Sequence, residues 1–146
     1  MQAAVGLAQI DRLPGFIDVR KQNFHLLNDG LAEFGDVFEL PHATPNSDPS
    51  WFGYPITVRD DAPFHRDEIL RYLNQHRIGT RLLFAGNLTR QPYKLGRNFR
   101  TIGDLPNADR IMRQWFWIGV YPGLDKSAID YVLDHFGKFV QGGVRV

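Results

Sequence analysis

The chain has 146 residues, of which 43% are hydrophobic and 23% are charged, and its formal net charge is +1. These values are ordinary for one globular domain with a core of its own. The absence of cysteine excludes a disulfide framework, a thiolate zinc site and an iron–sulfur site within the chain. No apolar run approaches the roughly 20 residues of a membrane-spanning helix, and no signal-peptide pattern is visible.

The N-terminal part of the chain has the spacing of two helices. Apolar side chains recur three or four residues apart from Ala3 to Ile10 and again from Phe16 to Phe34. Pro14 predicts a break or kink between the two helices, because proline lacks a backbone donor.

The first of these helices has no capping Ser, Thr, Asp or Asn before it. We therefore expect the chain to begin inside a longer protein. Residues 1–35 are predicted to be connecting helices at a junction with a missing domain, and residues 36–146 to form a small domain. The apolar face of the connecting helices should then be exposed or covered by another copy.

Strands and helices alternate in the rest of the chain. Strands are expected at 37–40, 50–59, 80–84, 99–102 and 115–120, and helices at 65–76, 107–114 and 126–139. Pro55 suggests an edge or a bulge in the second strand. Asn107 and Asp125 are expected to cap the helices that follow them. The pattern predicts an α+β fold, a small and mainly antiparallel sheet packed on helices 65–76 and 126–139.

The charges are unevenly distributed along the chain. Residues 1–61 carry four basic and nine acidic side chains, whereas residues 77–100 carry six basic side chains and no acid. Five of these six are arginines, whose planar guanidinium groups match phosphate and carboxylate. The stretch 77–100 is therefore either a solvated basic face or a site for an anion.

One loop in this basic stretch concentrates hydrogen-bonding side chains. The segment GNLTRQP (86–92) follows a predicted strand and carries Asn87, Thr89, Arg90 and Gln91. These four side chains need partners. They either tie the neighbouring backbone, as polar turns often do, or bind a ligand.

Other motifs of catalysis and binding are missing from the sequence. The five histidines show neither HxH nor HExxH spacing, so we expect no metal site. There is no P-loop, GxSxG or GxGxxG motif. Trp51, Trp115 and Trp117 could stack on bases beside the arginines. However, at least one of Trp115 and Trp117 is expected in the core, and no recognition motif supports nucleic-acid binding.

Three segments carry a family resemblance, namely MQAAVGLAQIDRLPGFIDVRKQNF (1–24), TRLLFAGNLTRQP (80–92) and LPNADRIMRQWFWIGVYPGL (105–124). They resemble the C-terminal part of DegT-type, pyridoxal-phosphate-dependent sugar aminotransferases. Within that family they are most similar to nucleotide-hexulose 3-dehydrases, and in particular to the CDP-6-deoxy-4-hexulose 3-dehydrases of lipopolysaccharide synthesis. The GNLTRQP segment indicates the dehydrase branch. The resemblance covers essentially the whole chain.

The resemblance implies the small C-terminal domain of a cytoplasmic, fold-type I homodimer whose missing domain holds the cofactor. It implies that the full-length enzyme removes the 3-hydroxyl group of a 4-keto-6-deoxy sugar nucleotide. Pyridoxamine or pyridoxal phosphate would be held without a covalent bond, because a histidine replaces the Schiff-base lysine. An iron–sulfur cluster and a reductase partner are implied for the CDP-sugar enzymes. No lysine here matches a Schiff-base motif, so this chain alone is expected to bind no cofactor and to be inert.

The resemblance also places the loop after strand 80–84 at the mouth of the active site. Asn87, Thr89, Arg90 and Gln91 are therefore predicted to contact the sugar nucleotide, with Arg90 against a phosphate. Two alternatives stay open. The domain could belong to a sugar-nucleotide aminotransferase, in which the cofactor residue is lysine, or it could be an independent anion-binding module that uses residues 77–100.

Overall fold

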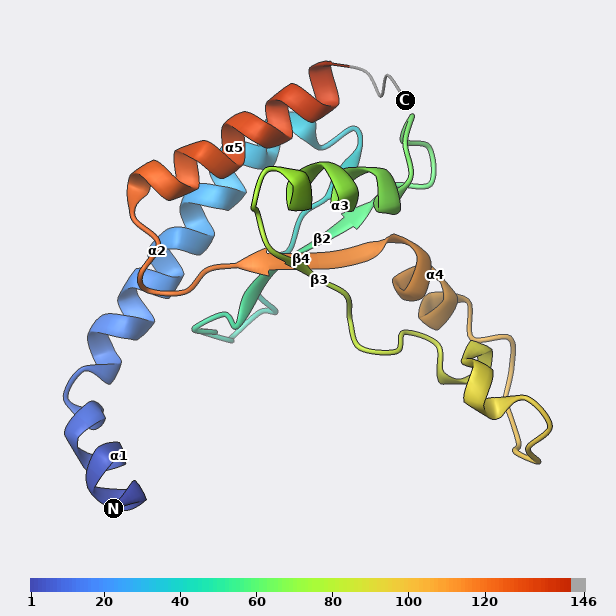
Figure 1. Ribbon diagram of the computed structural model, residues 1–146, viewed down its shortest axis with the longest axis horizontal. Helices are drawn as coiled ribbons and strands as arrows, with labels where there is room; N and C mark the ends of the chain where they lie inside the picture. Colours follow the sequence, from blue (N-terminus) through green and yellow to red (C-terminus); the bar gives the residue numbers. More distant parts are fainter. Residues whose placement is uncertain (143–146) are drawn as a thin grey trace.

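The computed structural model describes residues 1–142, which form a four-stranded antiparallel sheet with helices packed on it (Figure 1). This arrangement confirms the predicted α+β fold. The elements are, in chain order, α1 (Gln2–Ile10), α2 (Leu13–Leu31), β1 (Phe38–Glu39), β2 (Gly53–Val58), α3 (Arg66–Gln75), β3 (Thr80–Arg81), α4 (Pro106–Gln114), β4 (Trp115–Gly119) and α5 (Lys126–Gln141). Three 3₁₀ turns lie at Ala32–Phe34, Leu88–Arg90 and Pro92–Lys94.

The sheet has the strand order β1-β2-β4-β3, and every pair in it is antiparallel. In β2 and β4 alternate side chains are buried, because successive residues of a strand point to opposite faces. The buried residues of β4 are Phe116 and Ile118, whereas Trp115 and Trp117 are only half-buried. The expectation that at least one of these two tryptophans belongs to the core is therefore wrong. The register of β4 turns the face with Phe116 and Ile118 toward the core, and the tryptophans lie on the opposite face.

Pro55 lies in β2, which has neighbours on both sides and is not an edge strand. However, β1 pairs only with Thr57 and Val58. At Pro55 the strand pairs with Trp117 of β4 alone, among the residues described. The proline is tolerated because the sheet locally has an edge at that position.

The core lies between the sheet and three helices. It contains Phe24, Leu27 and Leu31 from α2, Ile69 and Leu73 from α3, and Ile129, Phe136 and Phe139 from α5. The Asp125 carboxylate accepts a hydrogen bond of 2.8 Å from the Ala128 backbone N–H, which confirms Asp125 as the N-cap of α5.

The N-terminal helix α1 extends away from the sheet and buries none of its residues (Figure 1). Val5, Leu7 and Ile10 are exposed on it. The predicted break falls between α1 and α2, since Pro14 lies in the first turn of α2, where a missing N–H costs little. From Asn23 onward α2 contributes to the core, so only its first part shares the exposure of α1. The division of the chain at residue 35 stays a prediction.

A second projection, which we call the arm (residues 82–105), joins β3 to α4. Here the structure differs from three expectations. β3 ends at Arg81, where its pairing with β4 ends, and Phe84 has a φ of 43°, which is incompatible with a strand. No strand forms at 99–102. α4 begins at Pro106 and not after an Asn107 cap, since proline suits the first helical position.

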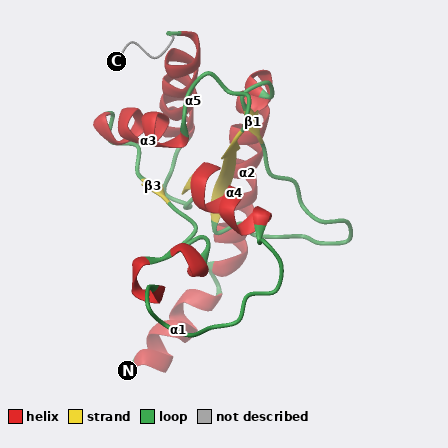
Figure 2. Cartoon of the chain, turned by 90° about the vertical axis from the view of Figure 1, so that its right-hand side faces the viewer, coloured by secondary structure: helices red, strands yellow, loops and turns green. Residues whose placement is uncertain are grey.

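Both α1 and the arm extend away from α3 and α5, toward the same side of the molecule (Figures 1 and 2). The arm exposes Phe84, Leu95 and Ile102, and Phe84 is 94% accessible. Among residues 1–142, no helix combines the length and the apolar character that crossing a membrane requires.

Candidate functional site

The loop at 85–91 is folded tightly against α4. Gly86 has a φ of 60°, and a Cβ atom on it would lie 2.6 Å from the Cβ of Met112 and 2.8 Å from its Cα. Only glycine combines this backbone conformation with so close an approach to another helix. The contact brings the polar side chains that follow Gly86 over the first turns of α4.

Asn87 is the buried centre of this loop, with 2% of its surface accessible. Its Nδ2 donates a hydrogen bond of 2.6 Å to Oδ1 of Asp109. Its Oδ1 accepts hydrogen bonds from the backbone N–H of Thr89, at 3.0 Å, and from Thr89 Oγ1, at 2.7 Å. The amide of Asn87 is thus satisfied on both sides within the chain.

Arg90 forms a two-point ion pair with the same carboxylate. Its Nε donates to Oδ1 of Asp109 at 3.2 Å, and its Nη2 donates to Oδ2 at 3.0 Å. The hydrogen bonds from Arg90 and then from Asn87 hold the pKa of Asp109 below its ordinary value. The Arg90 side chain is 59% exposed, whereas that of Asp109 is 12% exposed.

Gln91 closes the loop on itself. Its Nε2 donates to the backbone carbonyl of Ala85 at 2.5 Å and lies 4.0 Å from Sδ of Met112. All four residues predicted from the sequence therefore lie together, and each has a partner inside the chain. The sequence left two roles open for these side chains. The structure shows the first, hydrogen bonds to neighbouring parts of the chain, and contact with a sugar nucleotide stays a prediction.

Sequence reasoning missed Asp109, the residue that joins two of the four. A signal for it existed, since six basic side chains between residues 77 and 100 have no acid among them, so any ion pair that they form needs an acid from elsewhere in the sequence. Asp109 supplies that charge for Arg90. Which acid would do so was not predictable, because it depends on the packing of α4 against the loop.

The polar side chains of the loop do not line a common cavity. A cavity of about 280 Å³ lies beside the loop. It is lined by Arg66, Leu82, Leu83, Phe84, Ala85, Gly86, Gln91, Ile111 and Met112. Asn87, Thr89 and Arg90 lie outside this lining. Of the predicted residues, only Gln91 faces the cavity.

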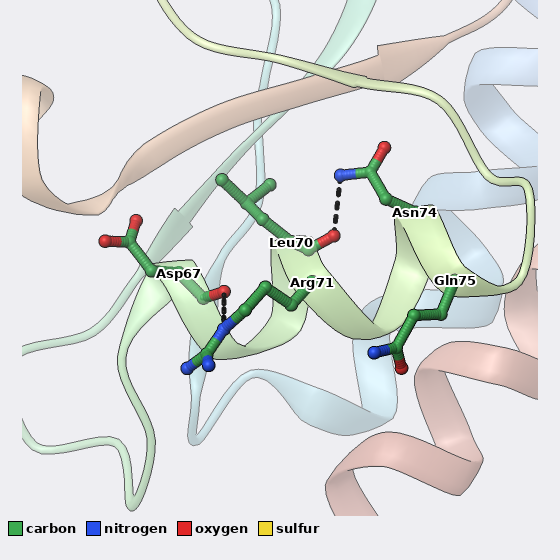
Figure 3. Close-up of a pocket in the computed structure, with 5 residues that line it drawn as sticks. All are labelled: Asp67, Leu70, Arg71, Asn74 and Gln75. Carbon is green, nitrogen blue, oxygen red and sulfur yellow. Dashed lines mark hydrogen bonds between the residues drawn. The ribbon is translucent and has the colours of Figure 1, made fainter.

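Another hollow, of about 560 Å³, follows the outer face of α3 and is drawn in Figure 3. All five of its lining residues come from this one helix. Arg71 Nε donates to the Asp67 carbonyl at 3.2 Å, and Asn74 Nδ2 donates to the Leu70 carbonyl at 2.7 Å. Because these side chains bond to the helix backbone, the hollow gathers no converging set of functional groups.

Two histidines that are distant in sequence meet between α3 and α5. The rings of His76 and His135 have centroids 4.2 Å apart, and Tyr72 Oη lies 3.1 Å from Nδ1 of His135. Burial, followed by the nearby His76 and Lys138, lowers the pKa of His135. No group of three or more metal-binding side chains occurs in residues 1–142.

No lysine among the described residues has the surroundings that a Schiff-base link to pyridoxal phosphate requires. Lys21, Lys126 and Lys138 are in ion pairs with Asp48, Asp130 and Asp134. Lys94 lies over the rings of Tyr93 and Phe99. A Schiff-base lysine instead requires a desolvated pocket that lowers its pKa, and none of these four has such surroundings.

The model of the DegT/DnrJ/EryC1/StrS aminotransferase family matches residues 1–137. The chain belongs to this family. The sequence is 52% identical over 139 residues to the lipopolysaccharide biosynthesis protein RfbH of Salmonella typhimurium. It is 42% identical over 140 residues to dTDP-4-dehydro-2,6-dideoxy-D-glucose 3-dehydratase of Saccharopolyspora spinosa. These matches cover 95% and 96% of the chain but 32% and 30% of the relatives, so the chain spans about a third of their length.

Solved structures of the family share the fold. S. venezuelae DesV in complex with a ketimine intermediate aligns over 100% of this chain and 37% of its own, with a TM-score of 0.80 and 25% identity. An E. coli GDP-4-keto-6-deoxy-D-mannose-3-dehydratase with bound hydrated PLP aligns over 90% of this chain and 33% of its own, with a TM-score of 0.79 and 24% identity. The predicted membership of a pyridoxal-phosphate-dependent, fold-type I family is confirmed. Its members include both sugar dehydratases and aminotransferases.

Proposed function

We propose that the chain is the substrate-covering C-terminal part of a nucleotide-hexulose 3-dehydrase. The full-length enzyme would remove the 3-hydroxyl group of a 4-keto-6-deoxy sugar nucleotide in dideoxysugar synthesis for lipopolysaccharide. The observation that carries the proposal is the 42% identity, over 96% of the chain, to a protein named as a sugar-nucleotide 3-dehydratase. The 52% identity to a lipopolysaccharide biosynthesis protein supports the proposed role in lipopolysaccharide synthesis.

In this proposal the chemistry belongs to the rest of the enzyme. Pyridoxamine or pyridoxal phosphate, and an iron–sulfur cluster with its reductase partner in the CDP-sugar enzymes, would be held outside residues 1–146. The enzyme would be a cytoplasmic homodimer, and this chain by itself would be inert. The exposed apolar side chains of α1 and of the arm support this reading, because both projections extend to one side and lack a covering surface.

The contribution of this chain would be to bind the anionic end of the substrate. Arg90 is the residue we propose for direct contact, since its side chain is more than half exposed while the orientation of its guanidinium is set by Asp109. The side-chain amide of Asn87, the hydroxyl of Thr89 and Nε2 of Gln91 form hydrogen bonds inside the chain. We propose that these three act on the substrate by shaping the loop that carries Arg90.

A chimeric enzyme tests the proposal. This chain would replace the homologous C-terminal segment of the S. spinosa 3-dehydratase, and mass spectrometry would follow loss of the 3-hydroxyl group from that enzyme's own substrate. We expect turnover, whereas a matched chimera with the corresponding segment of DesV should be impaired. A chimera that folds and binds cofactor but leaves the substrate intact would contradict the proposal.

The aminotransferase alternative rests on the similarity to DesV, at 25% identity. It predicts a different product, because an amino group would replace the keto oxygen when an amino donor is supplied. In the full-length enzyme the residue at the cofactor position would distinguish the two reactions, with histidine expected for the dehydrase and lysine for the aminotransferase.

A further inference from the structure

We propose that Asp109 of α4 is the positioning residue of the loop at 85–91, and that it leaves one edge of the Arg90 guanidinium for an oxygen atom of the substrate's phosphate. The inference rests on the proposed function and deepens it. Asp109 itself touches neither substrate nor cofactor in this scheme. It acts through Arg90 and Asn87.

Both oxygens of the Asp109 carboxylate are occupied by the loop. Oδ1 accepts from Asn87 Nδ2 at 2.6 Å and from Arg90 Nε at 3.2 Å, and Oδ2 accepts from Arg90 Nη2 at 3.0 Å. The Asp109 side chain is the shielded partner and the Arg90 side chain the exposed one. A buried acid therefore holds an exposed base in one orientation.

This geometry determines which part of Arg90 can reach a ligand. A guanidinium has five N–H donors in one plane, and Asp109 uses the edge formed by Nε and Nη2. Nη1 has no hydrogen-bond partner among the described residues. An anion would therefore meet Nη1 and the remaining N–H of Nη2, and the direction of approach is set by the plane that Asp109 fixes.

α4 is held firmly enough to transmit this constraint. Arg66 Nη1, from α3, donates to the Met112 carbonyl at 2.5 Å. Arg110 pairs with Glu39 of β1, and Gln114 donates to the Asp60 side chain. Asp109 thus connects the loop to a helix that is itself tied to the sheet and to α3, whereas the rest of the arm, residues 92–105, is largely exposed.

The test uses Asp109→Asn in the chimeric enzyme described above. The amide keeps the size of the side chain and removes its charge, so Arg90 loses its two-point partner. The Arg90 side chain must then be ordered when the substrate binds. Ordering one long side chain typically weakens affinity by roughly two- to tenfold. We expect KM for the sugar nucleotide to rise by that factor while kcat changes little. Asp130→Asn is the matched control, because it makes the same change in an ion pair of α5, with Lys126, that involves neither α4 nor Arg90.

A double-mutant cycle separates positioning from simple stability. In an Arg90→Ala background, Asp109→Asn should have no further effect on KM. A variant that lowers the melting temperature but leaves KM unchanged would overturn the inference. A KM that falls would also overturn it, because Asp109 would then compete with the substrate for Arg90.

Failure of the inference and failure of the proposed function are distinguishable. If the chimera with the native chain does not turn over the sugar nucleotide, the proposed function fails. Calorimetric binding of dTDP to the same proteins then still tests Asp109. Weaker binding by Asp109→Asn than by Asp130→Asn supports the positioning role, and equal binding by the two overturns it.

Discussion

Replacing the buried amide of Asn87 is the most direct test of how the loop is held. Asn87→Ala removes the hydrogen bond to the Asp109 carboxylate and the acceptor that Thr89 uses. The Thr89 groups are half-buried and can turn to water, so the lost bond to the charged acceptor should dominate. A hydrogen bond to a charged group contributes about 1.5–3 kcal/mol.

For a chain of this size, 1 kcal/mol changes the melting temperature by roughly 3 °C. We therefore expect Asn87→Ala to lower the melting temperature by about 4–9 °C, measured by circular dichroism and checked by urea denaturation. The matched control is Asn107→Ala, which removes an exposed amide from α4. It should leave stability unchanged or slightly raised, because alanine is the better helix former.

Asn87→Asp extends the test to pH. It keeps the shape of the side chain but places a second carboxylate against Asp109, so the pair should retain a proton in the folded state. The folded variant then binds more protons than the unfolded chain above about pH 4, and its stability deficit relative to wild type should grow as the pH rises. If Asn87→Ala and Asn107→Ala unfold alike, or if the deficit of Asn87→Asp does not vary with pH, the buried amide–carboxylate contact does not hold the loop.

Three further outcomes are expected. Arg90→Ala in the chimera should weaken apparent substrate affinity by roughly ten- to hundredfold. Arg90→Lys should recover only part of this affinity, since the point charge of lysine lacks the planar fork of a guanidinium. A lower melting temperature with unchanged kinetic constants would mean that Arg90 only stabilises the loop. Gly53→Ala should cost about 1–3 kcal/mol in urea denaturation, because its Cβ would lie 2.2 Å from Trp117, whereas Gly79→Ala meets no atom within 4 Å and should be tolerated. Burial lowers the pKa of His135, so the unfolded chain binds more protons near pH 6, and stability should fall as the pH drops below about 6.5. His135→Phe should flatten this part of the stability profile, and an unchanged slope would contradict the assignment.

Local pattern by itself determined the helices, the main strands and the family of this protein. The apolar spacing of α3 and α5 and the cap at Asp125 are local features, and they appear in the structure as predicted. The loop 85–91 was also identifiable, because four hydrogen-bonding side chains between a glycine and a proline require partners.

Tertiary structure decided what those side chains contact. Asp109 lies 22 residues after Asn87 and 19 after Arg90 in sequence, and the three side chains meet because Gly86 lets the loop approach Met112 of α4. In the same way, the register of β4 decided that Phe116 and Ile118 face the core and the flanking tryptophans do not. Composition and spacing specify which groups need partners, whereas the partner of each group depends on how distant segments pack, and that is a property of the folded chain alone.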